Sequence, residues 1–411
     1  MISTLLFDLD DTLLGNDLGT FLPAYFQRLT QHIAADLNGQ AERFLDELLN
    51  GLRAMMANTD PARTLSAVFA DHFYPVMGWE AETWSPRWED FYRTGFTELR
   101  PLTTSRPAAR AVMEWAFAQG YEVVIATSPL FPLTAIQERL RWAGIDDFPY
   151  TRITSYENSH FAKPHPEYFA EILAHLGRRT DEALVVGNDW NDDIVPAATL
   201  GLAHFWIAPA GSAVPDVSRT RLHPTGIGDL EMFLAWAQTA LPALAMPPAP
   251  ATAFPHLLLG DLAATAAALD DLPDSAWQFR PAESEWSPIE IVAHLRDVDG
   301  EVNLPRVRSV VETDNPFIAG VDTKSWAVER NYQAEPGREA RQGLITTRQQ
   351  LCAFLAEQPE AAWARPARHA YFGPTHLAEM VGWILDHDRL HLEQLRVTRQ
   401  KIASRNSAPG L

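Results

Sequence analysis

The chain has 411 residues, 46% of them hydrophobic and 21% charged, an ordinary composition for globular domains with packed cores. At about 150 residues per domain, this length predicts two or three domains. The formal net charge of −20 at pH 7 argues against nucleic acid and anionic membranes as partners, because phosphate groups repel an acidic surface. The single cysteine, Cys352, excludes an intrachain disulfide and a cysteine-rich metal cluster.

The sequence shows no secretion signal, because no basic segment precedes an apolar one near the amino-terminal end. No apolar run reaches the roughly 18 residues that a membrane-spanning helix needs. We therefore expect a cytoplasmic protein without a membrane span.

A segment rich in proline and alanine, LPALAMPPAPATAFP at residues 241–255, predicts a semi-rigid linker. We divide the chain there into two parts. In the first part, residues 1–15 and 101–240 are expected to form one domain, interrupted by an insert at residues 16–100. The second part is expected to form a separate domain at residues 256–411.

Short apolar runs alternate with helical patterns in the first part. The runs STLLFD, YEVVIATS, TRITS, EALVVGND and LAHFWIA are typical of strands, and helical patterns cover residues 107–118, 133–143, 166–176 and 192–200. This alternation predicts a doubly wound α/β fold with a mostly parallel sheet. The insert shows helical patterns without a convincing strand, so we expect it to be helical.

The second part shows no strand pattern. Helical patterns cover residues 257–271, 288–312, 337–358 and 375–400. At the start of the second of these, Ser287 and Glu290 match a capping box, and Pro288 takes the first helical position. Four such helices predict an antiparallel bundle.

Residues that carry chemistry follow the predicted strands of the first part. Asp8 and Asp10 follow the first strand, and side chains two apart on an extended segment point the same way. In a doubly wound sheet, ligands bind beyond the carboxyl ends of the strands. Clustered carboxylate oxygens there are the ligands that Mg²⁺ needs. Later segments add these residues to the set: Thr127, Ser128, Lys163, Asn188, Asp189, Asp192 and Asp193.

Each of these motifs also has a plainer interpretation. An aspartate-rich stretch such as DLDDT or GNDWNDD is common at a turn or at the start of a helix. Lys163 by itself is most simply a solvated lysine. The appearance of all the motifs in this order, each after a predicted strand, favours a functional site.

In this combination, the first part resembles the haloacid dehalogenase superfamily. The resemblance covers about residues 1–240, and the helical insert lies where one subclass carries an α-helical cap. Asn188 stands where glycine is more usual, so Asp192 remains a second candidate for the metal shell. The four motifs of the superfamily match Asp8-Leu9-Asp10-Asp11-Thr12, Thr127-Ser128, Lys163-Pro164, and Gly187-Asn188-Asp189 with Asp193.

The resemblance implies a Mg²⁺-dependent phosphatase that acts on a small phosphorylated metabolite. Asp8 would attack phosphorus and form an aspartyl-phosphate. Asp10 would protonate the leaving oxygen and then take a proton from water. Because a halide leaves without a proton, an acid at this second position favours a phosphatase over a dehalogenase. A phosphomutase is the alternative.

The resemblance also implies how the other motif residues bind. Thr127, Ser128 and Lys163 would bind the phosphoryl oxygens, and Lys163 would offset their growing charge. The Mg²⁺ ligands would come from Asp8, Asp10, Asp189 and Asp193.

Aromatic residues gather in the predicted insert. They would line a wall of the substrate site or fill the core of the insert, and the second interpretation is favoured. They are Trp79, Trp84, Trp88, Phe91 and Tyr92.

Three histidines in the second part have the spacing of metal ligands. His387 and His391 are one helical turn apart and share an apolar stripe with Met380 and Ile384, which predicts that they face the bundle interior. Two such histidines can bind one metal ion, and His294 from another helix would complete a set that leaves positions open for water. The alternative is that all three are core residues.

Residues from about 256 to 400 resemble the DinB-like metal-binding bundle family through SPIEIVAHL and DHDRLHLEQL. The resemblance implies a divalent transition metal, Zn²⁺, Ni²⁺ or Fe²⁺, because imidazole suits these ions better than Mg²⁺. Members include thiol-dependent transferases, so a transferase or hydrolase activity is one reading. The alternative is that the second part is a non-catalytic structural, dimerising or regulatory module. The sequence does not decide whether the chain forms a homodimer.

Overall fold

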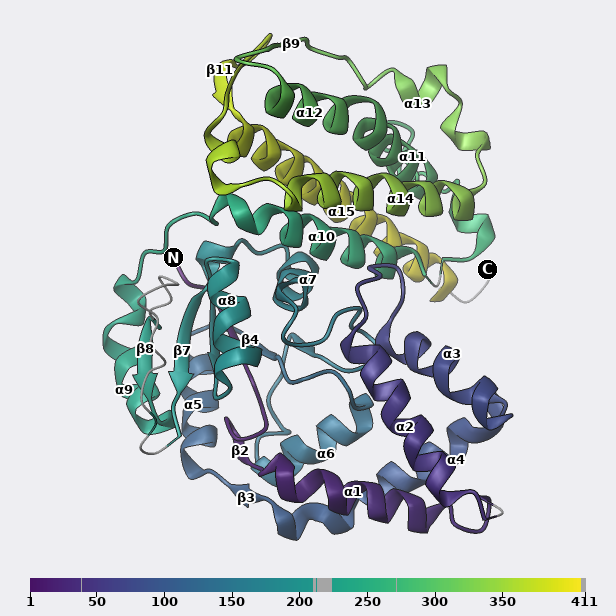
Figure 1. The fold of residues 1–411 in the computed structure, drawn as a ribbon, viewed down its shortest axis with the longest axis vertical. Coiled ribbons are helices and arrows are strands. Elements are labelled where there is room, and N and C mark those ends of the chain that lie inside the picture. Colours follow the sequence, from purple (N-terminus) through teal and green to yellow (C-terminus); the bar gives the residue numbers. More distant parts are fainter. Residues whose placement is uncertain (38, 210–211, 213–223, 271, 408–411) are drawn as a thin grey trace. The chain divides into compact units, whose positions relative to one another are not determined.

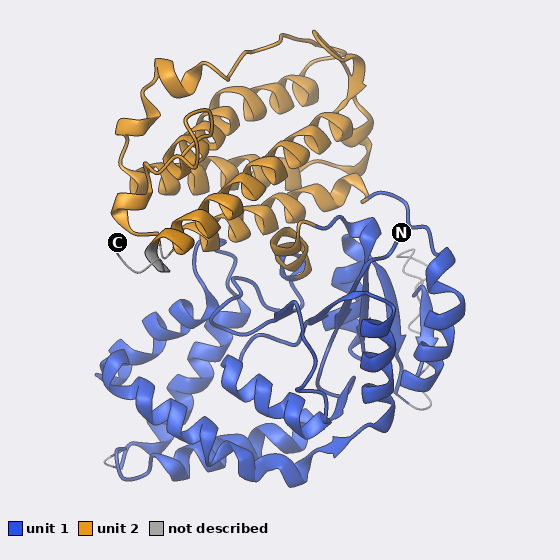
Figure 2. Cartoon of the chain, turned by 180° about the vertical axis from the view of Figure 1, so that it is seen from behind, with its two compact units in different colours: residues 1–168, 178–248 blue, residues 169–177, 249–411 orange. Residues whose placement is uncertain are grey.

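The computed structural model describes residues 1–37, 39–209, 212, 224–270 and 272–407. Its contacts divide the chain into two compact units (Figure 2), residues 1–168 with 178–248 and residues 169–177 with 249–411. The division between residues 248 and 249 lies inside the segment expected to be a linker. The predicted domain limits remain a prediction.

The first unit contains a six-stranded sheet in the order β5-β4-β1-β6-β7-β8. All neighbouring strands pair in parallel, which confirms the predicted doubly wound α/β class. The edge strand β8 was not predicted, because its sequence GIG is short and lacks an apolar pattern. The strands are β1 (Thr4–Phe7), β4 (Glu122–Ile125), β5 (Arg152–Ile153), β6 (Ala183–Gly187), β7 (Ala203–Ile207) and β8 (Gly226–Gly228).

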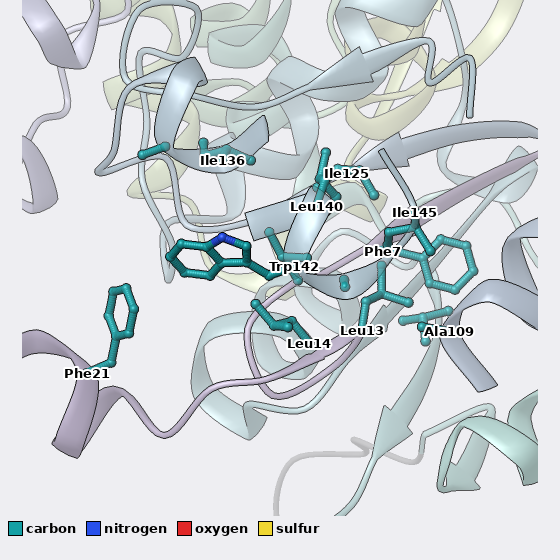
Figure 3. Packing of buried hydrophobic residues seen from close by; sticks show 14 of the residues in the cluster. Phe7, Leu13, Leu14, Phe21, Ala109, Ile125, Ile136, Leu140, Trp142 and Ile145 are labelled. Atoms are coloured by element: carbon teal, nitrogen blue, oxygen red, sulfur yellow. The ribbon is translucent and has the colours of Figure 1, made fainter. Parts of the chain in front are cut away.

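Strands β1, β6 and β7 are buried along their whole length, which explains their nearly continuous apolar sequences. Figure 3 shows Phe7, Ile125 and Ile145 in the core of this unit. The helices that alternate with the strands are α5 (Pro107–Ala118), α6 (Leu133–Ala143), α7 (Pro166–Leu176), α8 (Val195–Thr199) and α9 (Leu230–Thr239) (Figure 1). The helix predicted at 192–200 instead begins as a π-helical turn at Trp190–Ile194 and becomes α8.

The insert is helical, as predicted. Asp17 and Thr64 cap α1 and α3 by accepting hydrogen bonds from backbone N–H groups, and Gly78 ends α3 in the left-handed conformation (φ 69°). At the base of the insert, β2 (Leu14–Gly15) pairs with β3 (Thr104–Ser105), so its entry and exit lie side by side. Its helices are α1 (Leu18–His32), α2 (Ala41–Met56), α3 (Leu65–Met77) and α4 (Ala81–Arg93), followed by a 3₁₀ segment at Phe96–Leu102.

The second unit is a helical bundle, as predicted. Helix α11 packs against α14, and α10 packs against both α14 and α15. The capping box of Ser287 and Glu290 is present at the start of α11. A π-helical turn at Asp299–Asn303 joins α11 to α12. Besides residues 169–176 of α7, the helices of this unit are α10 (Phe254–Leu269), α11 (Pro288–Val298), α12 (Leu304–Glu312), α13 (Trp326–Glu329), α14 (Gly337–Ala356) and α15 (Leu377–Ser407).

The second unit also contains a small sheet, which corrects the prediction that this part has no strand. Strand β10 (Pro366–His369) pairs with β11 (Gly373–His376) and with β9 (Phe317–Ile318). These strands have two to four residues and include proline and glycine. Segments this short show too few alternations to be recognised from sequence.

We predicted that no segment could span a membrane. Judged by length and composition alone, this prediction is wrong for one segment. Residues 251–269, which include α10, are long and apolar enough to do so. However, 67% of this segment is buried within the protein. Extensive burial of this kind is what a core helix of a bundle requires.

Candidate functional sites

The turn after β1 is held by its own polar side chains. Asp11 adopts a left-handed backbone conformation (φ 56°), which aspartate tolerates better than most residues. Its carboxylate accepts a hydrogen bond from the backbone N–H of Asn16 at 2.9 Å. The chain therefore reverses directly after Asp8 and Asp10.

Asp8 is buried at the end of β1, with 7% of its surface exposed. One carboxylate oxygen accepts a hydrogen bond from Lys163 Nζ at 2.8 Å, and the other accepts one from the Thr12 hydroxyl at 2.9 Å. Burial raises the pKa of Asp8 to about 7, although the charge of Lys163 opposes the shift. Both oxygens are thus held in fixed positions.

Lys163 joins Asp8 to Asp193. Its Nζ donates a second hydrogen bond to Asp193 Oδ1 at 2.6 Å, and both side chains are buried. Burial alone would lower the pKa of Lys163, but the charges of Asp193 and Asp8 hold it well above its usual value. Burial also raises the pKa of Asp193. Two buried carboxylates therefore share one ammonium group.

The loop after β6 places Asp193 and Asp189. A Cβ atom at Gly187 would lie 2.3 Å from the Asp193 carboxyl group, so only glycine fits there. Asp193 Oδ2 accepts a hydrogen bond from the backbone N–H of Asp189 at 3.0 Å. The exposed Asp189 side chain caps the following turn by accepting from the N–H groups of Asn191 and Asp192.

Asp10 has different partners from Asp8. Its carboxylate forms an ion pair with the buried Arg139 of α6 and accepts a hydrogen bond from Asn16 Nδ2 at 2.8 Å. The Arg139 guanidinium also lies over the ring of Phe131, 4.7 Å from its centroid. Arg139 was not among the predicted site residues, although its place on the otherwise apolar face of α6 was a usable signal.

The remaining motif residues lie at neighbouring strand ends. Thr127 is buried after β4, and its carbonyl accepts hydrogen bonds from the Thr154 hydroxyl at 2.9 Å and the Tyr168 hydroxyl at 2.8 Å. Ser128 is half-buried beside it. Asn188 Oδ1 lies 3.1 Å from the Thr12 hydroxyl. The residue that departs from the superfamily pattern therefore links the loops after β1 and β6.

The negative charge of the acidic residues at this site suits a divalent cation. Their oxygens, however, do not converge as a complete set of metal ligands. Among the described residues, these aspartates do not form a group of three whose oxygens all lie within 4.8 Å of one another. The site nevertheless has more carboxylates than cations, since Asp8 and Asp193 share Lys163. Burial, and then the charge of Asp189, raises the pKa of Asp192 nearby. A further cation would relieve this excess of negative charge.

A cavity of about 870 Å³ lies between the helical insert and residues 130–132 of the first unit. Trp88 and Tyr92 belong to its wall, whereas Trp84 and Phe91 are buried in the core of the insert. The predicted aromatic group therefore contributes both to the core of the insert and to the wall of this cavity, and a place in the substrate site stays a prediction. Most other wall residues are apolar, including Leu22, Leu52, Phe69 and Phe131.

Two successive side-chain contacts connect this cavity to Asp10. Phe131 belongs to the wall of the cavity and lies against Arg139, which in turn pairs with Asp10. A molecule in the cavity would thus have an apolar wall beside it and the Asp10 carboxylate beyond Phe131.

In the second unit, α11 and α15 bring the three predicted histidines together. The Nε2 atom of His387 lies 3.2 Å from the Nε2 atoms of both His294 and His391. All three ligand atoms lie within 4.8 Å of one another. Metal–nitrogen bonds of about 2.0–2.1 Å, at angles between octahedral and tetrahedral, separate ligand nitrogens by about 2.8–3.4 Å. The two spacings of 3.2 Å at His387 fit one metal ion.

The surroundings of His294 and His391 favour the neutral form of both rings and orient His391. Burial lowers the pKa of His294 to about 3 and that of His391 to about 4. Neutral imidazole is the form that binds metal. His391 Nδ1 lies 2.9 Å from Gln394 Oε1, and the ring of Trp286 stacks on His391. Such contacts of the second ring nitrogen fix the direction of the first.

A buried ionic network adjoins the histidines and was not anticipated from the sequence. Arg348 of α14 donates to Asp299 Oδ2 at 2.6 Å and pairs with Asp388, and all three side chains are buried. Asp388 Oδ1 lies 3.8 Å from Nδ1 of His387. The network therefore places a carboxylate next to one candidate metal ligand.

Residues 2–201 match the haloacid dehalogenase-like hydrolase family, and residues 258–395 match the DinB superfamily. The ribulose-1,5-bisphosphate 5-phosphatase of Halopiger xanaduensis is 30% identical over 221 residues, which cover 51% of this chain and 86% of that protein. The chain belongs to the haloacid dehalogenase-like hydrolases. Residues 258–395 of this hydrolase belong to the DinB superfamily, so both resemblances drawn from the motifs are confirmed.

Other proteins are similar to parts of this hydrolase. The glyceraldehyde 3-phosphate phosphatase of Pyrococcus abyssi is 27% identical over 213 residues, covering 50% of this chain and 81% of that protein. The uncharacterized protein YuaE of Bacillus subtilis is 26% identical over 145 residues, covering 33% of this chain and 90% of that protein.

Among solved structures, a HAD phosphatase from Thermococcus onnurineus has a TM-score of 0.37 at 18% identity, covering 57% of this chain and 97% of that one. YfiT from Bacillus subtilis, described as a probable metal-dependent hydrolase with an unusual four-helix bundle topology, has a TM-score of 0.35 at 16% identity. It covers 37% of this chain and 87% of that one.

Proposed function

We propose that the first unit is a Mg²⁺-dependent phosphatase whose nucleophile is Asp8. The main support is the position of this carboxylate at the end of β1, where Lys163 and Thr12 fix its two oxygens. Asp10 follows two residues later, as an acid and base for the same reaction would. The phosphatase relatives that match this half of the chain agree with this reading.

The reaction proceeds in two steps. An oxygen of Asp8 attacks phosphorus and forms an aspartyl-phosphate, while the bond to the leaving oxygen breaks and Asp10 gives that oxygen a proton. Asp10 then takes a proton from water, whose oxygen attacks phosphorus and releases inorganic phosphate and free Asp8. The ion pair with Arg139 and the hydrogen bond from Asn16 hold the Asp10 carboxylate in place for both steps.

Other residues of the chain bind and balance charge. Lys163, Thr127 and Ser128 bind the phosphoryl oxygens, and the ammonium group of Lys163 offsets charge that develops on them. Asp8, the main-chain carbonyl of Asp10 and Asp189, helped by Asp193, would hold the Mg²⁺ ion. When bound, this ion supplies positive charge that screens the carboxylates from the phosphoryl group.

The proposed substrate class is a small phosphorylated metabolite. The names of two relatives specify glyceraldehyde 3-phosphate and ribulose 1,5-bisphosphate as their substrates. The wall of the cavity beside the insert is largely apolar in this hydrolase, so its leaving group is proposed to be less polar than those sugars.

The test is Asp8→Asn in the full-length hydrolase, assayed for phosphate release from a panel of phosphate esters with Mg²⁺. Loss of the nucleophile should lower the rate by about 1,000-fold or more while the melting temperature stays close to that of the wild type. Asp17→Asn, which alters an exposed helix cap, is the matched control. Retention of more than a few per cent of activity in Asp8→Asn would refute the assignment.

The same assay separates the phosphatase from the phosphomutase alternative. A phosphatase releases inorganic phosphate in proportion to ester consumed. A mutase instead moves phosphorus between two positions of one sugar, which ³¹P NMR detects as a new ester signal without inorganic phosphate.

For the second unit, we propose that His294, His387 and His391 bind one Zn²⁺, Ni²⁺ or Fe²⁺ ion, with water completing its shell. The observation that supports this is the convergence of three imidazole nitrogens. The bound ion would lower the pKa of its water and so supply hydroxide or a site for a thiolate. A hydrolase or thiol-transferase activity is consistent with this chemistry.

The metal content of the full-length hydrolase, purified without chelator, tests this site. We expect near one equivalent of a transition metal in the wild type and almost none in His387→Ala. His376→Ala removes an exposed histidine of the same unit and should leave the metal content unchanged. A wild type that holds no stoichiometric metal even when offered Zn²⁺ or Ni²⁺ would make the three histidines core residues of a non-catalytic bundle.

A further inference from the structure

Two cavities of the second unit meet at one of the candidate metal ligands. The larger, about 740 Å³, is lined by all three histidines, together with Trp286 and Lys324. The smaller, about 250 Å³, is lined by residues of α12, α15 and the small sheet. Thr323 and His387 belong to the walls of both. A molecule in the smaller cavity would therefore reach the histidine site past these two side chains.

The wall of the smaller cavity combines apolar and polar residues. Val302, Val307, Trp383 and Ile384 contribute apolar surface. Arg306, His369, Tyr371 and Asn303 contribute polar groups. This combination is typical of a site that holds an apolar molecule and orients it through a single polar group.

Arg306 is a half-buried cation without a carboxylate partner among the described residues. One of its amino groups donates to the backbone carbonyl of Ala319 at 2.7 Å. Burial lowers the pKa of Arg306, and Tyr371 is the neighbour that opposes this shift. Arg280, Arg296, Arg330 and Arg348 of the unit pair with carboxylates, whereas Arg365, like Arg306, donates to backbone carbonyls. Arg306 differs from Arg365 in lining a cavity, where its half-buried guanidinium can pair with an anionic ligand.

The groups around Arg306 favour an anion with one charge. Burial, and then the charge of Arg306, lowers the pKa of His369, so this ring is neutral at pH 7. Tyr371 and Asn303 offer hydrogen bonds but no positive charge. A phosphate dianion would lack a second cation here, whereas a planar carboxylate matches one guanidinium group.

The length of the ligand follows from α15. Trp383 packs against the ring of His369, which lies close to Arg306, with ring centroids 5.6 Å apart. His387 lies one turn further along the helix and Met380, also in the wall, lies two turns before it. At 1.5 Å per residue, these steps span about 6–10 Å.

We propose that the substrate of the second unit carries a carboxylate that binds Arg306. An aromatic or aliphatic body of about 6–10 Å fills the smaller cavity, and the reacting group at its other end reaches the three histidines past His387. This inference gives the substrate class of the metal site and rests on the function proposed for it. Arg306 binds and orients the substrate and takes no part in holding the metal.

The test uses two probes that differ only at the group that Arg306 would bind, 4-phenylbutyrate and 4-phenylbutyramide. Calorimetric titration of the Zn²⁺-loaded full-length hydrolase should show the acid binding about tenfold or more tightly than the amide, as expected for a charge-assisted pair. Arg306→Gln should remove this preference and leave amide binding unchanged. Arg308→Gln, which alters an exposed arginine on the same helix outside the cavity, is the matched control.

Equal affinity of the wild type for acid and amide would overturn the proposal, as would binding of neither probe at millimolar concentration. An unchanged preference in Arg306→Gln would also overturn it. If that variant does not fold, Arg306→Lys keeps the charge and should bind the acid more tightly than the amide. Metal content is measured in every variant, so a failure of the metal site is distinguished from a failure of the carboxylate subsite.

Discussion

At the scale of single residues, Asp261 of α10 is a buried carboxyl group whose titration should affect the stability of this hydrolase. Its side chain is buried, its nearest cationic nitrogen is Arg389 Nε at 3.7 Å, and its Oδ2 has no hydrogen-bond partner among the described residues. Burial raises its pKa from 3.8 to about 7, with Arg389 opposing the shift. The folded protein therefore holds this proton more tightly than the unfolded chain does.

Because the folded pKa lies above the unfolded one, Asp261 lowers the free energy of unfolding as the pH rises from about 4 to about 7. Asparagine has no such titration. We expect Asp261→Asn to stabilise the protein by about 1–3 kcal/mol more at pH 8 than at pH 5. Scanning calorimetry at the two pH values measures the difference. An equal change in melting temperature at both values would show that Asp261 is not protonated in the fold.

At the scale of elements, the helical insert combines a core of its own with one wall of a cavity. Helix α4 supplies Trp84 and Phe91 to the core and Trp88 to the cavity wall. The spacing of these residues places all three on one face of the helix, so this face borders both the core and the cavity. Helix α2 supplies Leu52 to the same wall. The volume of the cavity should therefore depend on side chains far from Asp8 and Asp10 in sequence.

Filling this cavity should change which leaving groups the hydrolase accepts. Leu52→Trp should lower activity on 1-naphthyl phosphate about tenfold or more relative to activity on ethyl phosphate, because the bulky ester loses its space. Val76→Trp, at an exposed position of α3 outside the cavity, is the control and should leave the ratio unchanged. A parallel loss of activity on both esters in Leu52→Trp would mean that the leaving group lies elsewhere.

At the scale of the whole molecule, the two units offer different kinds of candidate metal ligand. Carboxylate oxygens surround Lys163 in the first unit, and imidazole nitrogens converge in the second. Oxygen ligands favour Mg²⁺, whereas imidazole favours transition metals. Each unit also has buried apolar residues of its own. Stability measurements on the full chain should therefore respond to the two ions separately.

We expect calorimetry of the full-length hydrolase to show two unfolding transitions, of which Zn²⁺ raises one. At a Zn²⁺ concentration of about 100 times its dissociation constant, binding adds about 2.7 kcal/mol to that transition. For a unit of this size, that free energy corresponds to roughly 5–10 °C. His387→Ala should abolish the response to Zn²⁺. A single transition that shifts as a whole would instead show that the units unfold together.

The sequence by itself determined the parallel sheet, the helical insert and the bundle, because each depends on local periodicity that the chain carries in short segments. It also located the motifs that contain Asp8, Lys163 and Asp193. It located the three histidines as well, two of them one turn apart on one helix and the third on another helix. Their roles in catalysis and metal binding remain predictions. These features are readable because motif spacing and strand order fix where residues meet.

Only the tertiary structure decided the partners of these residues. Arg139 pairs with Asp10 across 129 positions of sequence, and Arg348 reaches Asp388 across 40. The strands β9 to β11 and the cavity beside Arg306 likewise form from segments that lack a local signal. Long-range pairs of this kind depend on how helices and strands pack, and packing places side chains by three-dimensional geometry rather than by spacing along the chain.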